Sequence, residues 1–335
     1  MPALALDVGT YTIKAISGKP GKKPVIEKTA EIFNSAGVNV PTDDAQAEKL
    51  SQIIDQFITD HKLPRSDLRL SFPETVVSTK IIEMPPLSDA ELASAIGWQA
   101  EQHIPIPQED LALEYQVLFR PPRKESNAQM RVLMIGTRKN LVDRFTNMFI
   151  QIGIEPKLLE TQMLSTLRSL GFTENEPTTL VAHLGATNMD LAVVYHDELS
   201  FVFTHMTGGQ LLTKTLAQNL NLDAKQAEEY KRAYGLDPQQ FEGKVRNALL
   251  PGVKQITNEM QKAVRFFVNQ HPQESIQRVI LAGGGAQLNQ LPEHLTQELG
   301  IEVLLAAPFA TASGEIPPTN HLAMTVAAGL LMREL

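Results

Sequence analysis

The sequence predicts an α/β protein whose two halves are alike and enclose a shared cleft, with a smaller α/β unit inserted in the first half. Strand-like runs and amphipathic helices alternate along the chain. One strand, glycine turn and strand pattern occurs twice, as LALDVGTYTIKA at residues 4–15 and as LVAHLGATNMDL at residues 180–191. A segment with strands and helices of its own begins at Thr79 and separates the two copies.

The composition limits the classes of function. The 335 residues suffice for two domains with buried cores, and 43% of them are hydrophobic. The 38 acids and 30 bases give a formal charge of −8, and no basic stripe is present, so we expect no nucleic-acid partner. The chain has no cysteine, which excludes disulfides, thiolate metal sites and cysteine nucleophiles.

No signal peptide or membrane-spanning segment is expected. The N-terminus has neither a basic region nor a long apolar run. The apolar segment 322–332 is far shorter than the ~20 residues that a spanning helix needs. We therefore expect a cytoplasmic protein that reaches a membrane only through a partner.

The first half begins with two predicted strands, residues 3–8 and 12–17, on either side of a Gly-Thr turn. A further apolar segment follows, and apolar residues at helical spacing predict a helix over residues 44–61. The run LRLSFP, residues 68–73, predicts another strand. We assign residues 1–78 to the core of the first domain.

Residues 79–157 are predicted to form the inserted unit. Its first strand ends at a Pro-Pro pair, and Ser88 with Glu91 gives the capping-box pattern at the start of a helix. The unit's remaining predicted elements are strands at 111–119 and 130–137, a polar hairpin tip at 121–129, a helix at 139–152 and a strand at 154–159.

The second half starts from a predicted helix at residues 161–171, which ends at Gly171 and leads to the second glycine hairpin. The elements that follow are strands at 191–195 and 199–204, helices within 210–271, a strand and glycine turn within 278–291, and a C-terminal helix. The predicted divisions are a connecting helix region (158–176), the second-domain core (177–210 and 276–313), a helical subdomain (211–275) and a C-terminal helix that returns to the first domain (314–335).

Each glycine hairpin is a candidate phosphate site. Glycine lets the backbone approach closely, so that successive N–H groups and hydroxyls can face an anion. In the first copy Lys14 adds a positive charge, and Asp7 is a candidate ligand for metal-bound water. A plain hairpin explains either copy alone, whereas two like hairpins can grip a polyphosphate from both sides. The candidate phosphate-binding residues are Gly9, Thr10, Tyr11, Thr12, Gly185, Ala186, Thr187, Asn188, Gly208 and Gly209.

A base and sugar need a third element, which the motif LAGGGA supplies. Its candidates, Gly283, Gly284, Gly285 and Ala286, offer little side chain to block a flat ring, although a tight strand-to-helix turn is the alternative. Glu228 and Lys231 lie three residues apart on a predicted helix and are placed to bond ribose hydroxyls. A solvated helix face explains that pair almost as well.

The order of these motifs resembles the actin, Hsp70 and sugar-kinase fold. The order is DxGT, an acid in the connecting region (Glu160), the second hairpin, AEEYK and LAGGGA. Within that superfamily, the segment EMPPLSDAELASAIGWQAEQHIPIPQEDLALEYQVL closely resembles the PilM family, cytoplasmic actin-like components of type IV pilus assembly. The resemblance spans essentially the whole chain and implies an actin-like ATPase fold, with two RNase H-like domains around a nucleotide cleft.

The resemblance also implies ligands and partners. It implies ATP with Mg²⁺ in the cleft, and the N-terminal cytoplasmic peptide of a bitopic, PilN-like membrane protein in a groove beside the inserted unit. Such an adaptor would lie at the inner membrane through its partner, contact other pilus platform components and serve twitching motility. Candidates for lining or supporting the groove are Met84, Trp98 and Ile104, with packing inside the inserted unit as the alternative. Self-association stays open.

One position departs from the family pattern. The second hairpin normally carries an acid that faces the magnesium ion, as Asp7 does in the first, but this chain has His183 there. A protonated histidine beside a divalent ion would be repelled, so a neutral ring is expected. We therefore expect nucleotide binding with slow or absent hydrolysis, and Glu160 as the residue that positions water. The alternative is that His183 ends its strand and points away; Asp190 lies in a different register and is not expected to replace the acid.

Two other functions remain open at this point. One is an active ATPase or phosphotransferase on the same scaffold, with Asp7, Glu160 and His183 as candidate catalytic residues. The other is a filament-forming division protein, although the amphipathic C-terminal membrane helix of that class is missing from the sequence. The remaining histidines show no pair at metal-ligand spacing, so no metal beyond nucleotide-borne magnesium is expected.

Overall fold

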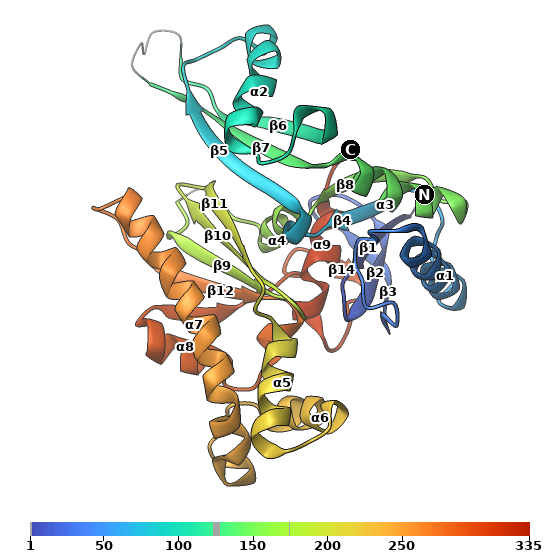
Figure 1. The fold of residues 1–335 in the computed structure, drawn as a ribbon, viewed down its shortest axis with the longest axis vertical. Helices are drawn as coiled ribbons and strands as arrows, with labels where there is room; N and C mark the ends of the chain where they lie inside the picture. Colours follow the sequence, from blue (N-terminus) through green and yellow to red (C-terminus); the bar gives the residue numbers. More distant parts are fainter. Residues whose placement is uncertain (1, 123–127, 174) are drawn as a thin grey trace.

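Two β-sheets, one in each half, form the body of the protein (Figure 1). The structure is a computed structural model that describes residues 2–122, 128–173 and 175–335. The first sheet has the order β14-β3-β2-β1-β4-β8. Its strands are β1 (Ala3–Val8), β2 (Thr12–Lys19), β3 (Val25–Phe33), β4 (Leu68–Phe72), β8 (Pro156–Thr161) and β14 (Ser313–Gly314).

The second sheet repeats the topology of the first. Its order is β11-β10-β9-β12-β13. In both sheets three antiparallel strands from consecutive hairpins are followed by two parallel strands, so β9 and β12 take the places of β1 and β4. The strands are β9 (Thr179–Leu184), β10 (Met189–Tyr195), β11 (Glu198–His205), β12 (Arg278–Ala282) and β13 (Glu302–Leu305).

Helices cover both faces of the first sheet, which explains why every residue of β1 is buried. On one face lie α1 (Asp44–Asp60) and α3 (Lys139–Gln151), and on the other lie α4 (Gln162–Leu170) and α9 (Thr325–Met332). Helices α4 and α9 approach so closely that a Cβ on Gly329 would lie 1.8 Å from the Ser165 carbonyl oxygen. Helix α4 therefore packs directly against α9 at this point.

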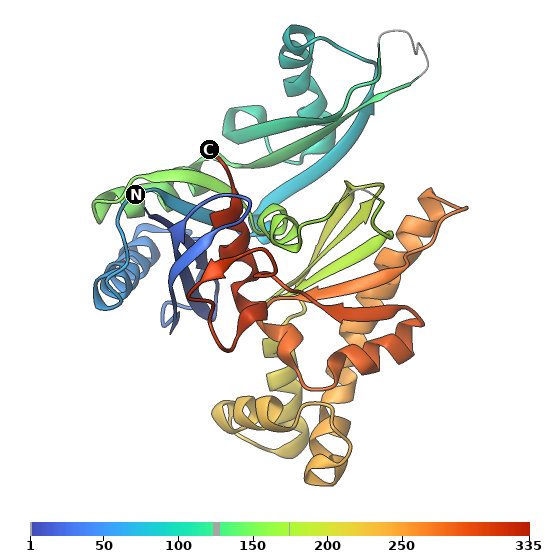
Figure 2. The ribbon, with the colours of Figure 1, turned by 180° about the vertical axis from the view of Figure 1, so that it is seen from behind.

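The second sheet packs on helices at one face and on the first half at the other. Its helices are α5 (Gly209–Leu220), α6 (Ala224–Tyr234), α7 (Lys244–Gln270) and α8 (Leu291–Leu299). Helices α5 and α6 extend with the first part of α7 to one end of the molecule, opposite the inserted unit (Figures 1 and 2). The other face packs against α4 and the inserted sheet.

The inserted unit is smaller than the sequence predicted. It is a sheet of order β5-β7-β6 with one helix across it. Helix α3 buries Phe145, Met148 and Phe149 in the first-domain core, and β8 pairs with β4, so residues 139–157 belong to the first domain. The unit's elements are β5 (Val77–Met84), α2 (Asp89–His103), β6 (Leu111–Phe119) and β7 (Met130–Arg138).

Local predictions had mixed outcomes. The capping box of Ser88 and Glu91 is present at the start of α2. The apolar segment after the first hairpin is a full strand, β3, and β13 was not anticipated. Within the predicted hairpin tip at 121–129, residues 123–127 lie outside the described part of the chain. No helix among the described residues is long and apolar enough to cross a membrane.

Candidate functional site

A cavity of about 740 Å³ lies between the two domains, and both glycine hairpins line it. This volume is within the usual range for small-molecule sites. The predicted residues that line it are Asp7, Gly9, Thr10, Tyr11, Thr12, Lys14, His183, Gly185, Ala186, Asn188, Gly209, Glu228, Lys231, Gly284 and Gly285. The predicted residues outside its lining are Glu160, Thr187, Gly208, Gly283 and Ala286.

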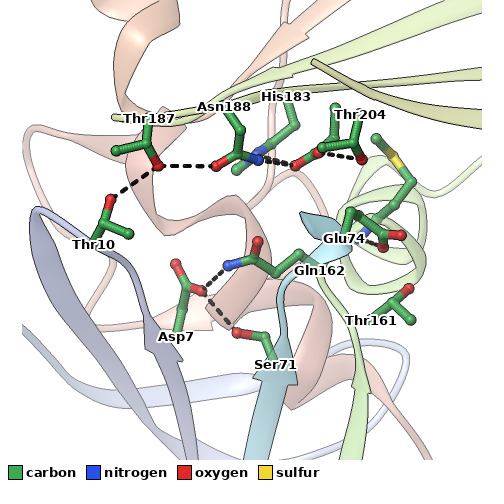
Figure 3. A network of polar contacts seen from close by, with 12 residues as sticks. Asp7, Thr10, Ser71, Glu74, Thr161, Gln162, His183, Thr187, Asn188 and Thr204 are labelled. Carbon is green, nitrogen blue, oxygen red and sulfur yellow. Dashed lines mark hydrogen bonds and ion pairs between the residues drawn. The ribbon is translucent and has the colours of Figure 1, made fainter. Parts of the chain in front are cut away.

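The two hairpins have the same turn and meet across the cavity. The Gly9 amide donates to the Thr12 carbonyl oxygen over 3.0 Å, and the Gly185 amide donates to that of Asn188 over 2.9 Å. Thr10 Oγ1 and Thr187 Oγ1 lie 3.2 Å apart, so the hairpins are hydrogen-bonded to each other (Figure 3). A Cβ on Gly9 would lie 2.8 Å from the Thr12 oxygen, which explains the glycine.

Asp7 supplies a buried negative charge at the cavity wall. Its Oδ1 accepts hydrogen bonds from Ser71 Oγ (2.8 Å) and Gln162 Nε2 (2.9 Å), as Figure 3 shows. Lys14 Nζ lies 3.1 Å from Oδ2. Burial raises the pKa of the Asp7 carboxyl, but Lys14 and these hydrogen bonds outweigh it, so the pKa lies below its ordinary value. Asp7 is therefore ionised at neutral pH.

The connecting segment brings Gln162, not Glu160, to the cavity. Glu160 accepts from both terminal nitrogens of Arg168 and from Ser165 Oγ (2.6 Å), so its carboxylate is held at the α4–α9 contact. Gln162 begins α4, lines the cavity and donates to Asp7. The expectation that Glu160 positions a water in the cleft therefore does not fit its location.

His183 lines the cavity, which does not fit the alternative that it points away. Its side chain is 10% exposed, and its Nδ1 has no hydrogen-bond partner among the described residues. Burial lowers the pKa of His183 to about 4, although the charge of Asp7 acts in the opposite direction. The ring is therefore neutral at physiological pH, as the sequence analysis expected.

Asp190 lies behind His183 rather than in the cavity. The two residues are directly opposite each other on β9 and β10, and His183 Nδ1 is 4.0 Å from Asp190 Oδ2. Asp190 accepts from Asn188 Nδ2 (2.8 Å) and Thr204 Oγ1 (2.9 Å). Burial and the nearby charge of Glu74 raise the pKa of Asp190 to about 7. It does not replace the missing cavity-facing acid.

Helix α6 brings a partly buried charged pair, Glu228 and Lys231, to the cavity wall beside α5. Lys231 Nζ donates to Glu228 Oε2 (2.6 Å), to Thr213 Oγ1 (2.8 Å) and to the Gly209 carbonyl oxygen (3.2 Å). Burial lowers the pKa of Lys231, and its ion pair with Glu228 opposes that shift. The pair is therefore part of a bonded network rather than a solvated helix face.

The triple glycine divides into a packing part and a cavity part. Gly283 has φ +82°, and a Cβ there would lie 2.4 Å from the Leu184 carbonyl oxygen, so it joins β12 to β9. Ala286 is buried. Gly284 and Gly285 line the cavity and leave its wall without side chains.

Several cavity residues had not been predicted. Gln162 lines the cavity and donates to Asp7, and Asn34, which lies outside the lining, supports the first hairpin because its Nδ2 donates to the Gly9 carbonyl oxygen over 2.8 Å. Four further polar residues of the cavity lining come from four segments far apart in the sequence, so no local motif marks them. They are Glu31, Arg232, Gln287 and Asn320.

Residues 5–335 match the family model described as type IV pilus assembly protein PilM. The chain belongs to this family. Its structure is similar to that of the PilM-PilN type IV pilus biogenesis complex, with a TM-score of 0.84 and 24% identity over 98% of this chain and 97% of the other.

Two further structures resemble this PilM-family protein at lower identity. One is the ethanolamine utilization protein EutJ from Carboxydothermus hydrogenoformans, with a TM-score of 0.62 and 16% identity over 99% of this chain and 89% of the other. The second is MreB5 of Spiroplasma citri bound to AMPPNP, with a TM-score of 0.54 and 12% identity over 98% and 94%. These likenesses confirm the predicted actin-like ATPase fold.

Proposed function

We propose that this PilM-family protein is an ATP-binding adaptor that holds a PilN-like membrane protein at the pilus assembly platform and hydrolyses ATP slowly or not at all. Nucleotide binding is supported chiefly by the contact between the two hairpins at Thr10 and Thr187, beside one cavity that both domains line. The similar MreB5 structure, whose bound ligand is AMPPNP, supports a nucleotide in a cleft of this fold.

The phosphates would lie between the hairpins. Amide groups at glycine turns attract anions, and both turns face the cavity at Gly9 and Gly185. Lys14 adds a cation at the same wall. The nucleoside would extend toward Gly284 and Gly285, where the wall has no side chains, and toward Lys231, whose side chain offers a hydrogen-bonding group.

The donor set fits a magnesium ion held mainly by the phosphates. Mg²⁺ keeps several waters and is usually bound through one or two carboxylates plus substrate phosphates. Asp7 offers one ionised carboxylate at the cavity wall, and among the described residues no group of three or more acids and histidines is arranged to hold a metal ion. Asp7 would hold the ion through water, and the ion would neutralise phosphate charge.

Slow hydrolysis follows from the neutral second hairpin. His183 adds no negative charge opposite Asp7, and Asp190 is buried behind it. A second candidate, an active ATPase, is favoured by Gln162, whose amide lies at the cavity and is able to orient water. Phosphate release from Mg-ATP distinguishes them: we expect almost none, whereas turnover that Gln162→Ala abolishes would establish the ATPase.

We assign the binding surface for the PilN-like partner to the inserted unit. The similar solved structure is described as a PilM-PilN complex, and the inserted segment carries the sequence resemblance. Met84 and Ile104 are 5% and 2% exposed in the core of the unit, so they would support a binding surface from beneath. Trp98 is 60% exposed on α2 and is free to contact a peptide.

A peptide pull-down tests this assignment. The N-terminal cytoplasmic peptide of a PilN-like protein should be retained by the full chain, with and without Mg-ATP compared. Trp98→Ala should reduce retention without altering the unfolding midpoint, because the ring is mostly in solvent. Met206→Ala, which removes a 73% exposed side chain in the second domain, is the matched control and should retain the peptide. Equal retention by both variants would remove Trp98 from the proposal.

A further inference from the structure

Three polar side chains form a hydrogen-bonded chain along the cavity wall. Glu31 lies on β3, Asn320 lies between β14 and α9, and Gln287 lies in the turn after β12. Asn320 Nδ2 donates to the Glu31 carboxylate, and Gln287 Nε2 donates to Asn320 Oδ1 over 2.5 Å. All three line the cavity, so this chain links both domains beside the ligand space.

The carboxylate fixes the direction of the whole chain. Asn320 turns its NH₂ group toward Glu31, whose carboxylate oxygen accepts the hydrogen bond. Its Oδ1 then faces Gln287, which must turn its own NH₂ group toward Asn320. Gln287 Oε1 is therefore left as a free acceptor, and no group in the described ranges 2–122, 128–173 and 175–335 donates to it.

Asn320 is held in place by its backbone as well. Its φ of 63° and ψ of 25° lie in the left-handed region, which asparagine tolerates better than most residues. The Ala323 amide donates to the Asn320 carbonyl oxygen over 3.2 Å. A local turn thus fixes the backbone of the middle residue of the chain.

We propose that Gln287 determines base specificity, because its Oε1 accepts a hydrogen bond from the 6-amino group of a purine, with Glu31 and Asn320 as positioning residues. Gln287 directly follows the Gly284–Ala286 turn, the bare wall to which the nucleoside is assigned, so this inference rests on the proposed nucleotide function. A 6-oxo purine would place an acceptor against an acceptor. The site therefore selects adenine nucleotides over hypoxanthine and guanine nucleotides.

The test compares Mg-ATP with Mg-ITP on the full chain by titration calorimetry, because the two bases differ at position 6 and its adjoining ring nitrogen. We expect ATP to bind about tenfold more tightly, as expected for one lost hydrogen bond plus an opposed acceptor. Gln287→Met, which keeps the length and removes the acceptor, should bring the ratio close to one. Glu31→Gln should also lower it, since a neutral amide no longer forces the direction of the chain.

The ratio of the ATP affinity to the ITP affinity separates a role in base specificity from general effects on nucleotide binding. The charge of Glu31 also raises the pKa of Arg232. Loss of this interaction in Glu31→Gln would change the affinities for ATP and ITP by the same factor, and so would leave their ratio unchanged. Glu27→Gln removes an exposed acid from the same strand and should keep the wild-type ratio. Equal binding of ATP and ITP by the wild type, or an unchanged ratio in Glu31→Gln, would overturn this inference alone. Binding of neither nucleotide would overturn the proposed function as well.

Discussion

The two glycine hairpins have the same backbone but exchange the positions of acid and base. Asp7 and Lys14 are directly opposite each other on β1 and β2, and His183 and Asp190 are directly opposite on β9 and β10. The same offset of 176 residues separates Asp7 from His183 and Lys14 from Asp190. The acid is therefore on the first strand of one hairpin and on the second strand of the other.

The exchange makes the two walls of the cavity chemically different. In the first hairpin the acid faces the cavity, and Lys14 keeps it ionised. In the second hairpin the cavity-facing residue is an uncharged imidazole, and the acid is enclosed where burial favours its protonated form. Under the proposed function, the duplicated turn would keep phosphate contacts on both sides and confine the site for a cation to one side.

The largest expected effect is a pair of opposite pH dependences in stability. His183 has a pKa of about 4 in the folded state against an ordinary 6.5, so its contribution falls by about 3 kcal/mol as the pH drops through that interval. Asp190 has a folded pKa of about 7 against 3.8, so its contribution rises by about 4 kcal/mol as the pH drops from 7. In the wild type the two effects largely cancel.

Single variants should expose the two slopes. Urea unfolding between pH 7.5 and 4.5 should show Asp190→Asn losing stability relative to the wild type as the pH falls. His183→Asn should gain stability relative to the wild type over the same range. Comparison with the wild type removes the contribution of the other carboxylates. If the free energy of unfolding depended on pH in the same way in all three proteins, the shifted pKa values of His183 and Asp190 would be refuted.

Removing the acid from each hairpin should affect nucleotide binding very differently. Asp7→Asn is expected to weaken Mg-ATP about 30-fold, the effect of losing a charged contact worth about 2 kcal/mol. Metal-free ATP should be affected much less, because no cation then needs the carboxylate. Asp190→Asn at pH 8 is the matched control and should change the affinity little, since this acid lies outside the cavity. Titration calorimetry with and without Mg²⁺ measures the ATP affinity of both variants. Similar losses of Mg-ATP affinity in Asp7→Asn and Asp190→Asn would refute the difference between the two hairpins.

The backbone, in contrast, should respond alike in both hairpins. A Cβ would lie 2.8 Å from the Thr12 oxygen in Gly9→Ala and 3.0 Å from the Asn188 oxygen in Gly185→Ala. Each variant should therefore lose about 1 kcal/mol in free energy of unfolding, because the turn must widen. Gly209→Ala is the control, since its nearest atoms would be 3.7 Å away. Thermal unfolding compares the three, and one tolerant hairpin would show that the turns are not equivalent.

The duplicated topology could be predicted from the sequence, because the topology depends on local signals. Both hairpins have a glycine between apolar runs, and their register follows from alternation along the strands. The sequence could not assign α3 to the first domain, because an amphipathic helix shows which of its faces is apolar and not which sheet will cover it. The boundary of the inserted unit was misplaced for this reason.

The site residues also divide into those that local sequence predicts and those that only tertiary packing determines. Glu160 and Gln162 are two residues apart, and only the pairing of β8 with β4 and the start of α4 decide which one reaches Asp7. Glu31, Gln287 and Asn320 meet from three segments far apart in sequence. Motif spacing predicts the parts of a cleft that come from one turn, whereas contacts across the cleft depend on tertiary packing.

The smallest expected effect concerns the direct bond between the hairpins. Thr187 Oγ1 donates to Asn188 Oδ1 (3.3 Å), so Thr10 is the donor in the 3.2 Å contact with Thr187. Thr10→Val and Thr187→Val keep the side-chain shape and remove this bond. A double-mutant cycle should give a coupling of about 0.5 kcal/mol in unfolding free energy without nucleotide, typical of a partly exposed hydrogen bond. A coupling of zero would mean that the two hydroxyls are not hydrogen-bonded to each other in the protein without nucleotide.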